Sequence, residues 1–129
     1  MKWVKQSIHY WCPDTKEHKF LGQNVTVAIL DTGISPHPDF KDRILSFRDF
    51  SSTTGSSEKV LFSFSHFSPL IDNSGHGTHV AGILAGSGLL SSGTYAGIAP
   101  FCNLIIGKVL DQNGNGSIKN VINGIQMDP

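Results

Sequence analysis

Two short apolar runs constrain the fold of this chain more than any other feature. They occupy residues 25–30 (VTVAIL) and 103–110 (NLIIGKVL), and both are rich in β-branched residues. Their side chains are apolar at nearly every position rather than at every second one. Strands of this composition are buried on both faces, which is typical of a parallel sheet covered by helices. The chain therefore favours an α/β fold.

Helical patterns follow in the order that such a fold requires. Residues 76–85 (HGTHVAGILA) carry Val80, Ile83 and Leu84 at the i, i+3, i+4 spacing of a helix that packs on one side. A second helix is predicted after Ser117, which is a good N-cap residue. Its apolar face contains Ile118, Val121, Ile122 and Ile125.

The rest of the chain is less strongly patterned. Residues 44–47 predict a further short strand, and residues 60–67 (VLFSFSHF) alternate as a half-buried strand does. The order strand, helix, strand, helix predicts one α/β domain with parallel strands and crossover helices. We assign residues 22–129 to this domain and residues 1–21 to an irregular N-terminal arm.

Charge and composition exclude several classes of protein. Ten basic and ten acidic residues give a net charge of zero, so no nucleic-acid partner is predicted. No apolar run approaches the roughly 18 residues of a membrane-spanning helix, so no membrane association is predicted. The N-terminus lacks the apolar core of a signal peptide, and we expect the chain, as written, in the cytoplasm. Cys12 and Cys102 are too few for a disulfide framework.

Asp31 is the first candidate functional residue, because it comes directly after the buried run 25–30. Active sites in open α/β sheets lie beyond the carboxyl ends of the strands. A carboxylate in this position needs a partner, since leaving it unpaired beside an apolar strand is costly. Two interpretations stay open: a functional carboxylate, or an aspartate that only forms the Asp-Thr-Gly turn.

His76 is the second candidate, in the segment 72–82 (DNSGHGTHVAG) at the start of the predicted helix. Glycines on both sides of His76 allow another backbone or a substrate to approach closely. An imidazole that titrates near neutral pH is the usual proton shuttle. A locally hydrogen-bonded histidine is the alternative. A metal pair of His76 and His79 is a further one, but neither a cysteine nor an HExxH pattern supports it.

These motifs carry a family resemblance. Residues 27–40 (VAILDTGISPHPDF) and 73–86 (NSGHGTHVAGILAG) resemble the Asp and His signature blocks of the subtilases, the subtilisin-like serine endopeptidases. Residues 95–125 are similar to the stretch that follows those blocks. The resemblance implies an incomplete subtilisin-like three-layer α/β fold with a mostly parallel sheet. It also implies that the chain holds only the N-terminal part of the catalytic domain.

The resemblance also implies catalytic roles. Asp31 matches the aspartate that orients the catalytic histidine and stabilises its imidazolium form. His76 matches the general base, which takes a proton from the serine hydroxyl and returns it to the leaving amine. His79 matches no catalytic position and is interpreted as a structural residue of the helix.

The substrate of such an enzyme is a polypeptide, and the resemblance places its binding positions late in the chain. Gly114, Asn115 and Gly116 match a segment that pairs with an extended substrate backbone as an added strand. Ile118 and Val121 fall where the family lines a pocket for a substrate side chain.

The resemblance implies no cofactor for the chemistry itself. Asp39 matches a carboxylate that ligates calcium in some members. The loop that would complete such a site, roughly residues 87–95, differs in length and contains no carboxylate. The sequence therefore argues against a calcium ion at Asp39.

The family's nucleophile is missing from these 129 residues, since no Gly-Thr-Ser-Met-Ala block occurs in them. We expect a truncated peptidase domain that is inactive and prone to self-association on its own. A separate chain that supplies the C-terminal half is one alternative. A non-catalytic remnant that binds peptides is another.

A different protease class also fits part of the sequence. Asp31-Thr32-Gly33 after an apolar strand is the catalytic motif of retroviral-type aspartic proteases, and the chain length suits a half-site that dimerises. Those proteases are almost entirely β, so the His76 segment and the α/β pattern argue against this alternative.

Overall fold

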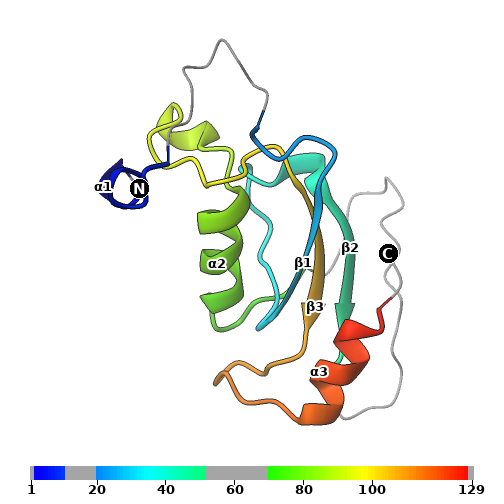
Figure 1. The fold of residues 1–129 in the computed structure, drawn as a ribbon. Helices are drawn as coiled ribbons and strands as arrows, with labels where there is room; N and C mark the ends of the chain where they lie inside the picture. The colour runs from blue at the N-terminus through cyan, green and yellow to red at the C-terminus, as the bar shows by residue number, and fades with distance from the viewer. Residues whose placement is uncertain (1, 11–19, 52–69, 128–129) are drawn as a thin grey trace.

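The computed structural model describes residues 2–10, 20–51 and 70–127. Within them, one parallel sheet contains β1 (Thr26–Asp31), β2 (Ile44–Asp49) and β3 (Asn103–Lys108) in the order β1-β3-β2 (Figure 1). The parallel sheet predicted from the two apolar runs is confirmed. The strand predicted over 60–67 lies outside the described residues.

The strands differ from the predicted ones mainly at their ends. Asp31 is the last residue of β1 rather than the first residue after it, because it pairs with Lys108 of β3. Its carbonyl oxygen also accepts the backbone N–H groups of Val109 and Leu110. β2 extends past the predicted residue 47, as Arg48 and Asp49 continue the pairing with β3. Asp31 is thereby held on the sheet by its own backbone.

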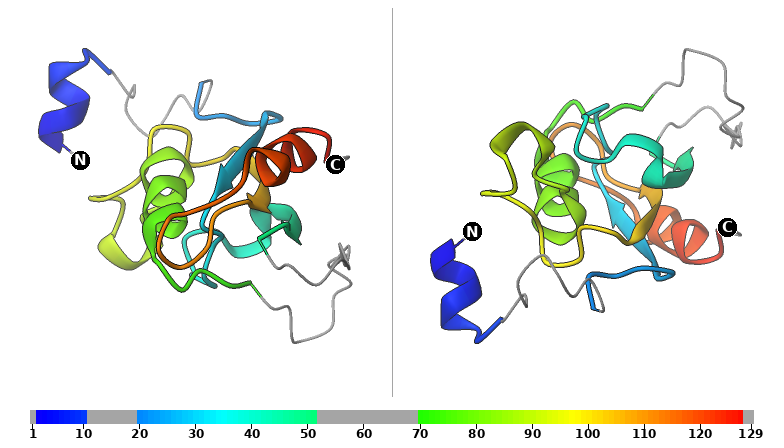
Figure 2. Two further views of the ribbon diagram at one scale, coloured as in Figure 1. Left: turned by 90° about the horizontal axis from the view of Figure 1, so that it is seen from below. Right: turned by 90° about the horizontal axis from the view of Figure 1, so that it is seen from above.

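Two helices cover opposite faces of the sheet, α2 (His76–Ala85) and α3 (Ile118–Ile125), as Figure 2 shows. Successive residues of a strand point to opposite faces. Ile29 of β1 accordingly belongs to the core cluster that contains Ala81 of α2. The next residue, Leu30, contacts the position of Gly124 in α3. The described part of the chain therefore has the predicted three-layer arrangement.

The core lies between the sheet and α2. Its buried side chains are Ile29, Ile34, Phe40, Ile44, Phe47, Ala81, Ala85, Cys102, Leu104 and Ile106. At one edge of this core Arg43 donates to the carbonyl oxygens of Asp39, Ala85 and Cys102. A single guanidinium group therefore joins the segment after β1, the end of α2 and the start of β3. Burial lowers the pKa of Arg43, while Cys102 and Asp39 nearby act to raise it.

Two 3-10 turns and a short helix complete the described elements. The turns are η1 (Lys41–Arg43) and η2 (Leu89–Ser91), and the helix is α1 (Lys2–Ser7). The prediction that the arm is irregular is wrong over α1, because this segment contains no glycine or proline to oppose helix formation. The Tyr10 hydroxyl donates to the carbonyl oxygen of Ile98 at 2.6 Å and so connects the arm to the domain.

The apolar stripe predicted for α2 is partly wrong. Ile83 is exposed, and the fully buried positions of this helix are Gly77, Ala81 and Ala85. The helix packs through its smallest residues because it approaches the neighbouring backbone very closely. A Cβ atom added at Gly77 would lie 2.2 Å from the carbonyl oxygen of Gly33.

The apolar face predicted for α3 exists, but it is largely exposed. Ile118 and Ile125 are 79% and 70% exposed, and only Gly124 of this helix is buried. Ser117 caps the helix as predicted, since its side chain accepts the N–H of Asn120. In the described residues, the helices are too short or too polar to cross a bilayer.

Candidate active site

Asp31 and His76 lie together at the end of β1 and the start of α2. The His76 Nδ1 atom is 2.8 Å from the Asp31 Oδ1 atom, which is the distance of a strong hydrogen bond. The Asp31 side chain is only 13% exposed, whereas that of His76 is 64% exposed. The imidazole of His76 therefore lies at the surface, and a mostly buried carboxylate fixes its orientation.

Glycines make this approach possible. Gly77 follows His76 and faces Gly33, with no room for a side chain between them. Gly75 precedes His76 and has a φ of 84°, a left-handed conformation that favours glycine. The sequence predicted that the glycines beside His76 allow another backbone to approach closely. In the structure that backbone is at Gly33, which lies against Gly77.

The charge of Asp31 acts on His76. The hydrogen bond that His76 donates to Asp31 raises the pKa of His76, and the negative charges of Asp31 and Asp72 raise it further. Partial desolvation acts weakly in the opposite direction. The Asp31 carboxylate is itself fixed, because its Oδ1 atom also accepts the backbone N–H of Thr32 at 2.7 Å. The imidazolium form of His76 is thus favoured over that of a free histidine.

A buried lysine lies beside the pair. Lys108 is 5% exposed, and its Nζ atom donates to the carbonyl oxygens of Thr32 and Leu110, each at 2.8 Å. These contacts satisfy an ammonium group that would otherwise be costly to bury. They also join the turn after β1 to the segment after β3. This role was not predicted, because Lys108 lies inside the apolar run 103–110 that predicts a strand.

Asp72 is a further residue that the sequence analysis did not single out. Burial acts to raise the pKa of its carboxyl group, but hydrogen bonds from Thr78, Thr32 and Gly75 outweigh burial and lower the pKa to about 2. An aspartate a few residues before a predicted helix is a common capping signal, and that signal was present in the sequence.

The predicted substrate-binding residues lie on a separate exposed segment. Gly114, Asn115 and Gly116 form part of an exposed turn between β3 and α3, where Gly114 has a φ of 80°. Ile118 is exposed and Val121 is half-buried in α3. These positions follow β3, the strand next to the one that carries Asp31. Their role in binding substrate stays a prediction.

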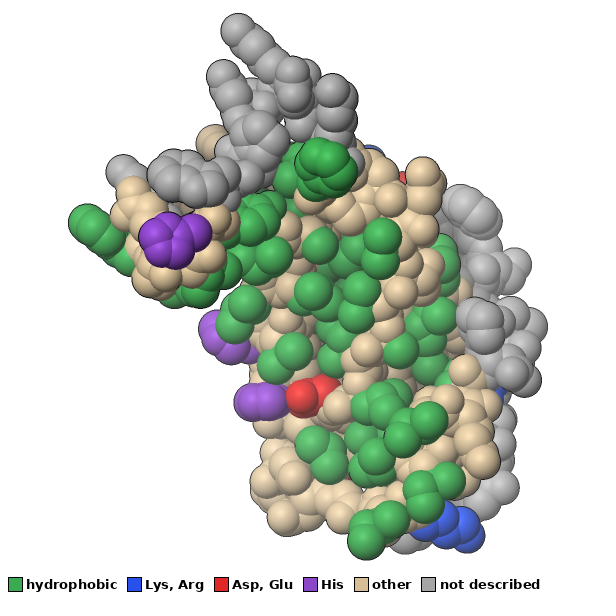
Figure 3. Space-filling model, in the orientation of Figure 1, with side chains coloured by type: hydrophobic (Ala, Val, Ile, Leu, Met, Phe, Trp, Pro, Cys, Tyr) green, Lys and Arg blue, Asp and Glu red, His purple; other side chains and the backbone are tan. Residues whose placement is uncertain are grey.

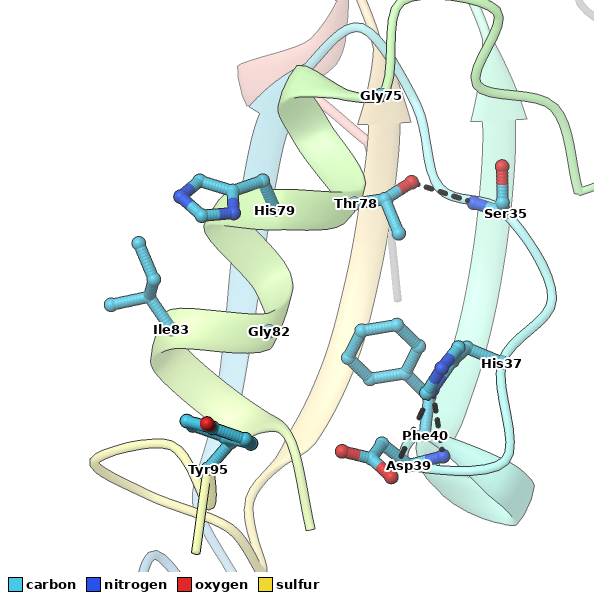
Figure 4. A pocket seen from close by; sticks show the side chains of 10 residues that line it. All are labelled: Ser35, His37, Asp39, Phe40, Gly75, Thr78, His79, Gly82, Ile83 and Tyr95. Atoms are coloured by element: carbon cyan, nitrogen blue, oxygen red, sulfur yellow. Dashed lines mark hydrogen bonds and ion pairs between the residues drawn. The ribbon is translucent and has the colours of Figure 1, made fainter. Parts of the chain in front are cut away.

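A cleft beside α2 does not contain the Asp31–His76 pair. It has a volume of about 630 Å³ and separates α2 from the loop after β1 (Figure 4). The lining includes His37, Asp39 and His79, but neither Asp31 nor His76. The 2.8 Å hydrogen bond between His76 and Asp31 therefore lies outside this cleft. The alternative of a His76–His79 metal site gains no support, since no group of three or more metal-binding side chains gathers in this part of the chain.

Asp39 borders this cleft without assembling a calcium site. Its Oδ2 atom accepts the N–H of Gly88 at 3.0 Å, and its Oδ1 atom lies 3.8 Å from His37 Nδ1. The loop that contains Gly88 offers no second carboxylate. The Arg43 guanidinium already occupies the carbonyl oxygens of Asp39 and Ala85. The Asp39 Oδ1 atom is buried and has no hydrogen-bond partner among the described residues, and a metal at Asp39 rests on the resemblance alone.

Together, the fold and the pair define a class of protein. A histidine hydrogen-bonded to a carboxylate at the carboxyl edge of a parallel α/β sheet matches the relation between His and Asp in the triad template of nucleophilic hydrolases. The same layers exclude the retroviral-type aspartic protease, whose fold is almost entirely β.

The chain belongs to the subtilase family, whose family model matches residues 22–128. It is 46% identical over 105 residues to serine protease AprX of Bacillus subtilis, a match that covers 81% of this chain and 21% of that protein. It is 39% identical over 115 residues to subtilisin E of Bacillus subtilis, covering 88% of this chain and 26% of that protein.

Solved structures show the same relationship. The CspB protease of Clostridium perfringens superimposes with a TM-score of 0.69 at 27% identity, covering 86% of this chain and 26% of that one. Sphericase superimposes with a TM-score of 0.64 at 32% identity, and the match covers 81% of this chain and 31% of that one. The chain thus spans between about a fifth and a third of the length of these relatives.

Proposed function

We propose that this chain supplies the aspartate and the histidine of a serine endopeptidase site. The observation that carries the proposal is the 2.8 Å contact between His76 Nδ1 and Asp31 Oδ1, formed by the two residues that match the family's catalytic positions. Asp31 fixes the ring orientation and stabilises the imidazolium form. His76 takes the proton of a serine hydroxyl and transfers it to the leaving amine. These steps use side chains alone.

The exposure of His76 supports this role. Nδ1 is engaged by Asp31, so Nε2 is the ring nitrogen left to exchange a proton with a nucleophile. With 64% of the side chain exposed, the ring is open to a hydroxyl from another segment of polypeptide. The raised pKa of His76 favours the protonated form that returns the proton to the leaving amine.

The substrate in this proposal is a polypeptide. Gly114, Asn115 and Gly116 pair with its extended backbone as an added strand, and Ile118 and Val121 contact one of its side chains. The exposure of the 114–116 turn and of Ile118 supports this assignment.

We propose further that these 129 residues alone do not hydrolyse peptides. They contain no Gly-Thr-Ser-Met-Ala block. Loss of the nucleophile lowers the turnover of a subtilisin by on the order of 10⁶-fold. Each missing oxyanion donor costs a further factor of about 10²–10³ while others remain. The serine therefore comes from polypeptide outside these residues, on the same chain or on a separate one.

The exposed apolar surface supports such an addition. Figure 3 shows a broad apolar area on the face that carries β1 and extends to α3. β1 pairs only with β3 in the described sheet, so its other edge carries no strand there. Further polypeptide on this edge and on α3 would bury Ile122 and Ile125.

An active-site probe tests the proposal. The purified chain is incubated with a fluorophosphonate and, separately, with an unstructured peptide substrate, and His76→Ala is the matched control. We expect no covalent labelling and no cleavage above the His76→Ala background. Labelling of a serine within these residues, abolished by His76→Ala, would contradict the proposed inactivity. Cleavage that persists in His76→Ala would point to a contaminant or to a site other than the pair.

A further inference from the structure

The start of α2 does not fix the position of His76 by itself. His76 is the first residue of the helix, and the capping residue Gly75 has no side chain. The first N–H groups of a helix have no acceptors within it and need partners from elsewhere. The orientation of the His76 ring therefore depends on what holds this turn.

Asp72 provides most of those partners. Its Oδ1 atom accepts the backbone N–H groups of Gly75 at 2.9 Å and Ser74 at 3.2 Å. Its Oδ2 atom accepts the backbone N–H of Thr78 at 2.8 Å and the Thr78 hydroxyl at 2.5 Å. One carboxylate thus binds residues on both sides of His76.

Thr32 connects this arrangement to Asp31. The Thr32 hydroxyl donates to Asp72 Oδ1 at 2.8 Å and accepts the backbone N–H of Gly77 at 2.9 Å. Thr32 is 1% exposed, and its own backbone N–H donates to Asp31 Oδ1. The residue next to the carboxylate is therefore bonded to the residue next to the imidazole.

We propose that Thr32 and Asp72 are positioning residues that set the distance between Asp31 and His76. We call their shared hydrogen bonds, with Gly77 and Thr78, the Thr32–Asp72 network. The inference rests on the proposed function, because it assigns the two residues to the same pair. A hydroxyl is required at position 32, since only a group that donates and accepts at once makes both contacts. An ionised carboxylate is required at position 72, because it accepts five hydrogen bonds.

The test measures the pKa of His76 by NMR in the intact chain and in variants of Thr32. Thr32→Val keeps the shape and the charge and removes both hydroxyl contacts, whereas Thr32→Ser keeps the hydroxyl. Asp72→Asn alone would not discriminate, because it also removes a charge that acts on His76. Amide spectra of each variant verify the fold.

We expect the pKa of His76 to fall toward 6.5 in Thr32→Val and to stay raised in Thr32→Ser. A folded Thr32→Val variant with an unchanged His76 pKa would overturn the network and leave the proposed function intact. An unmodified chain in which His76 titrates at 6.5 or below would overturn both. The two failures are therefore distinguishable.

A second measurement covers the case in which Thr32→Val does not fold. The Gly77 N–H lies in the first turn of α2, where amides usually lack protection from hydrogen exchange. The contact with Thr32 Oγ1 predicts slow exchange at Gly77 in the unmodified chain. Exchange at the rate of an unprotected amide would overturn the network.

Discussion

A mostly buried carboxylate and an exposed imidazole make the pair asymmetric. Asp31 is anchored by its place in β1 and by the N–H of Thr32. His76 is anchored on one ring nitrogen only. Because the pKa of His76 is raised in the folded chain, the pair stabilises the fold fully below the pKa of an unfolded histidine. That contribution is lost as the pH rises through the folded pKa.

Asp31 and His76 were predictable from the sequence because each lies in a continuous motif that local residues define. The hydrogen bond between Thr32 and Asp72 was not, because the two residues lie 40 positions apart in the chain. Lys108 was missed for a similar reason, since the carbonyl oxygen of Thr32 that it binds is remote in sequence. Residue types in a sequence do not show contacts between residues that are far apart in the chain.

Asp72 gives the first prediction, on stability against pH. Its folded pKa of about 2 lies below the ordinary 3.8, so its hydrogen bonds stabilise the fold above pH 3.8. This contribution is lost as the pH falls from 3.8 toward 2. The free energies of unfolding of the unmodified chain and of Asp72→Asn, measured with urea, should therefore differ at neutral pH and become equal in acid. A difference that stays constant down to pH 2 would contradict the hydrogen-bonded state of Asp72.

At the level of elements, the strands and helices were predicted well where apolar patterning is strong. The bounds of α2 match the predicted 76–85, and β3 begins at the predicted residue. The face of α2 was assigned correctly for Val80 and Leu84, which pack against the core, and wrongly for Ile83, which is exposed. Hydrophobicity also does not show the backbone contact of α2 with Gly33, where Gly77 leaves no room for a side chain.

Gly77→Ala tests this close approach. The added methyl would meet the Gly33 carbonyl at 2.2 Å, so the helix has to move. We expect a loss of about 1–3 kcal/mol in the free energy of unfolding, as for overpacking in general. Gly82→Ala is the matched control on the same helix, because nothing lies within 4 Å of its added methyl. It should be neutral or stabilising by up to about 1 kcal/mol. Equal effects of the two substitutions would contradict the contact.

On the scale of the whole molecule, an apolar face and an edge of β1 carry no covering segment from the described residues. The resemblance assigned Ile118 and Val121 of the α3 stripe to a substrate side chain, and in the described residues Ile118, Ile122 and Ile125 are exposed. The relatives are three to five times longer than the matched region. The proposed function accounts for both observations, because further polypeptide would bury the same face.

Self-association of the isolated chain is the corresponding prediction. Each large aliphatic side chain that becomes buried contributes about 1.5–3 kcal/mol, so this face favours contact between copies. Ile118→Lys combined with Ile125→Lys should shift sedimentation profiles toward the monomer. Asn123→Lys adds charge at an exposed position of α3 outside the apolar stripe and should have little effect. A chain that is already monomeric at high concentration, with a cooperative thermal transition, would contradict this account.

The titration of His76 tests the central claim most directly. The ring proton shifts of His76 are followed against pH in the unmodified chain and in Asp31→Asn. The account predicts a His76 pKa above 6.5 in the unmodified chain and a fall toward 6.5 once the carboxylate is lost. A pKa at or below 6.5, or one that Asp31→Asn leaves unchanged, would show that the two side chains do not form a pair in solution.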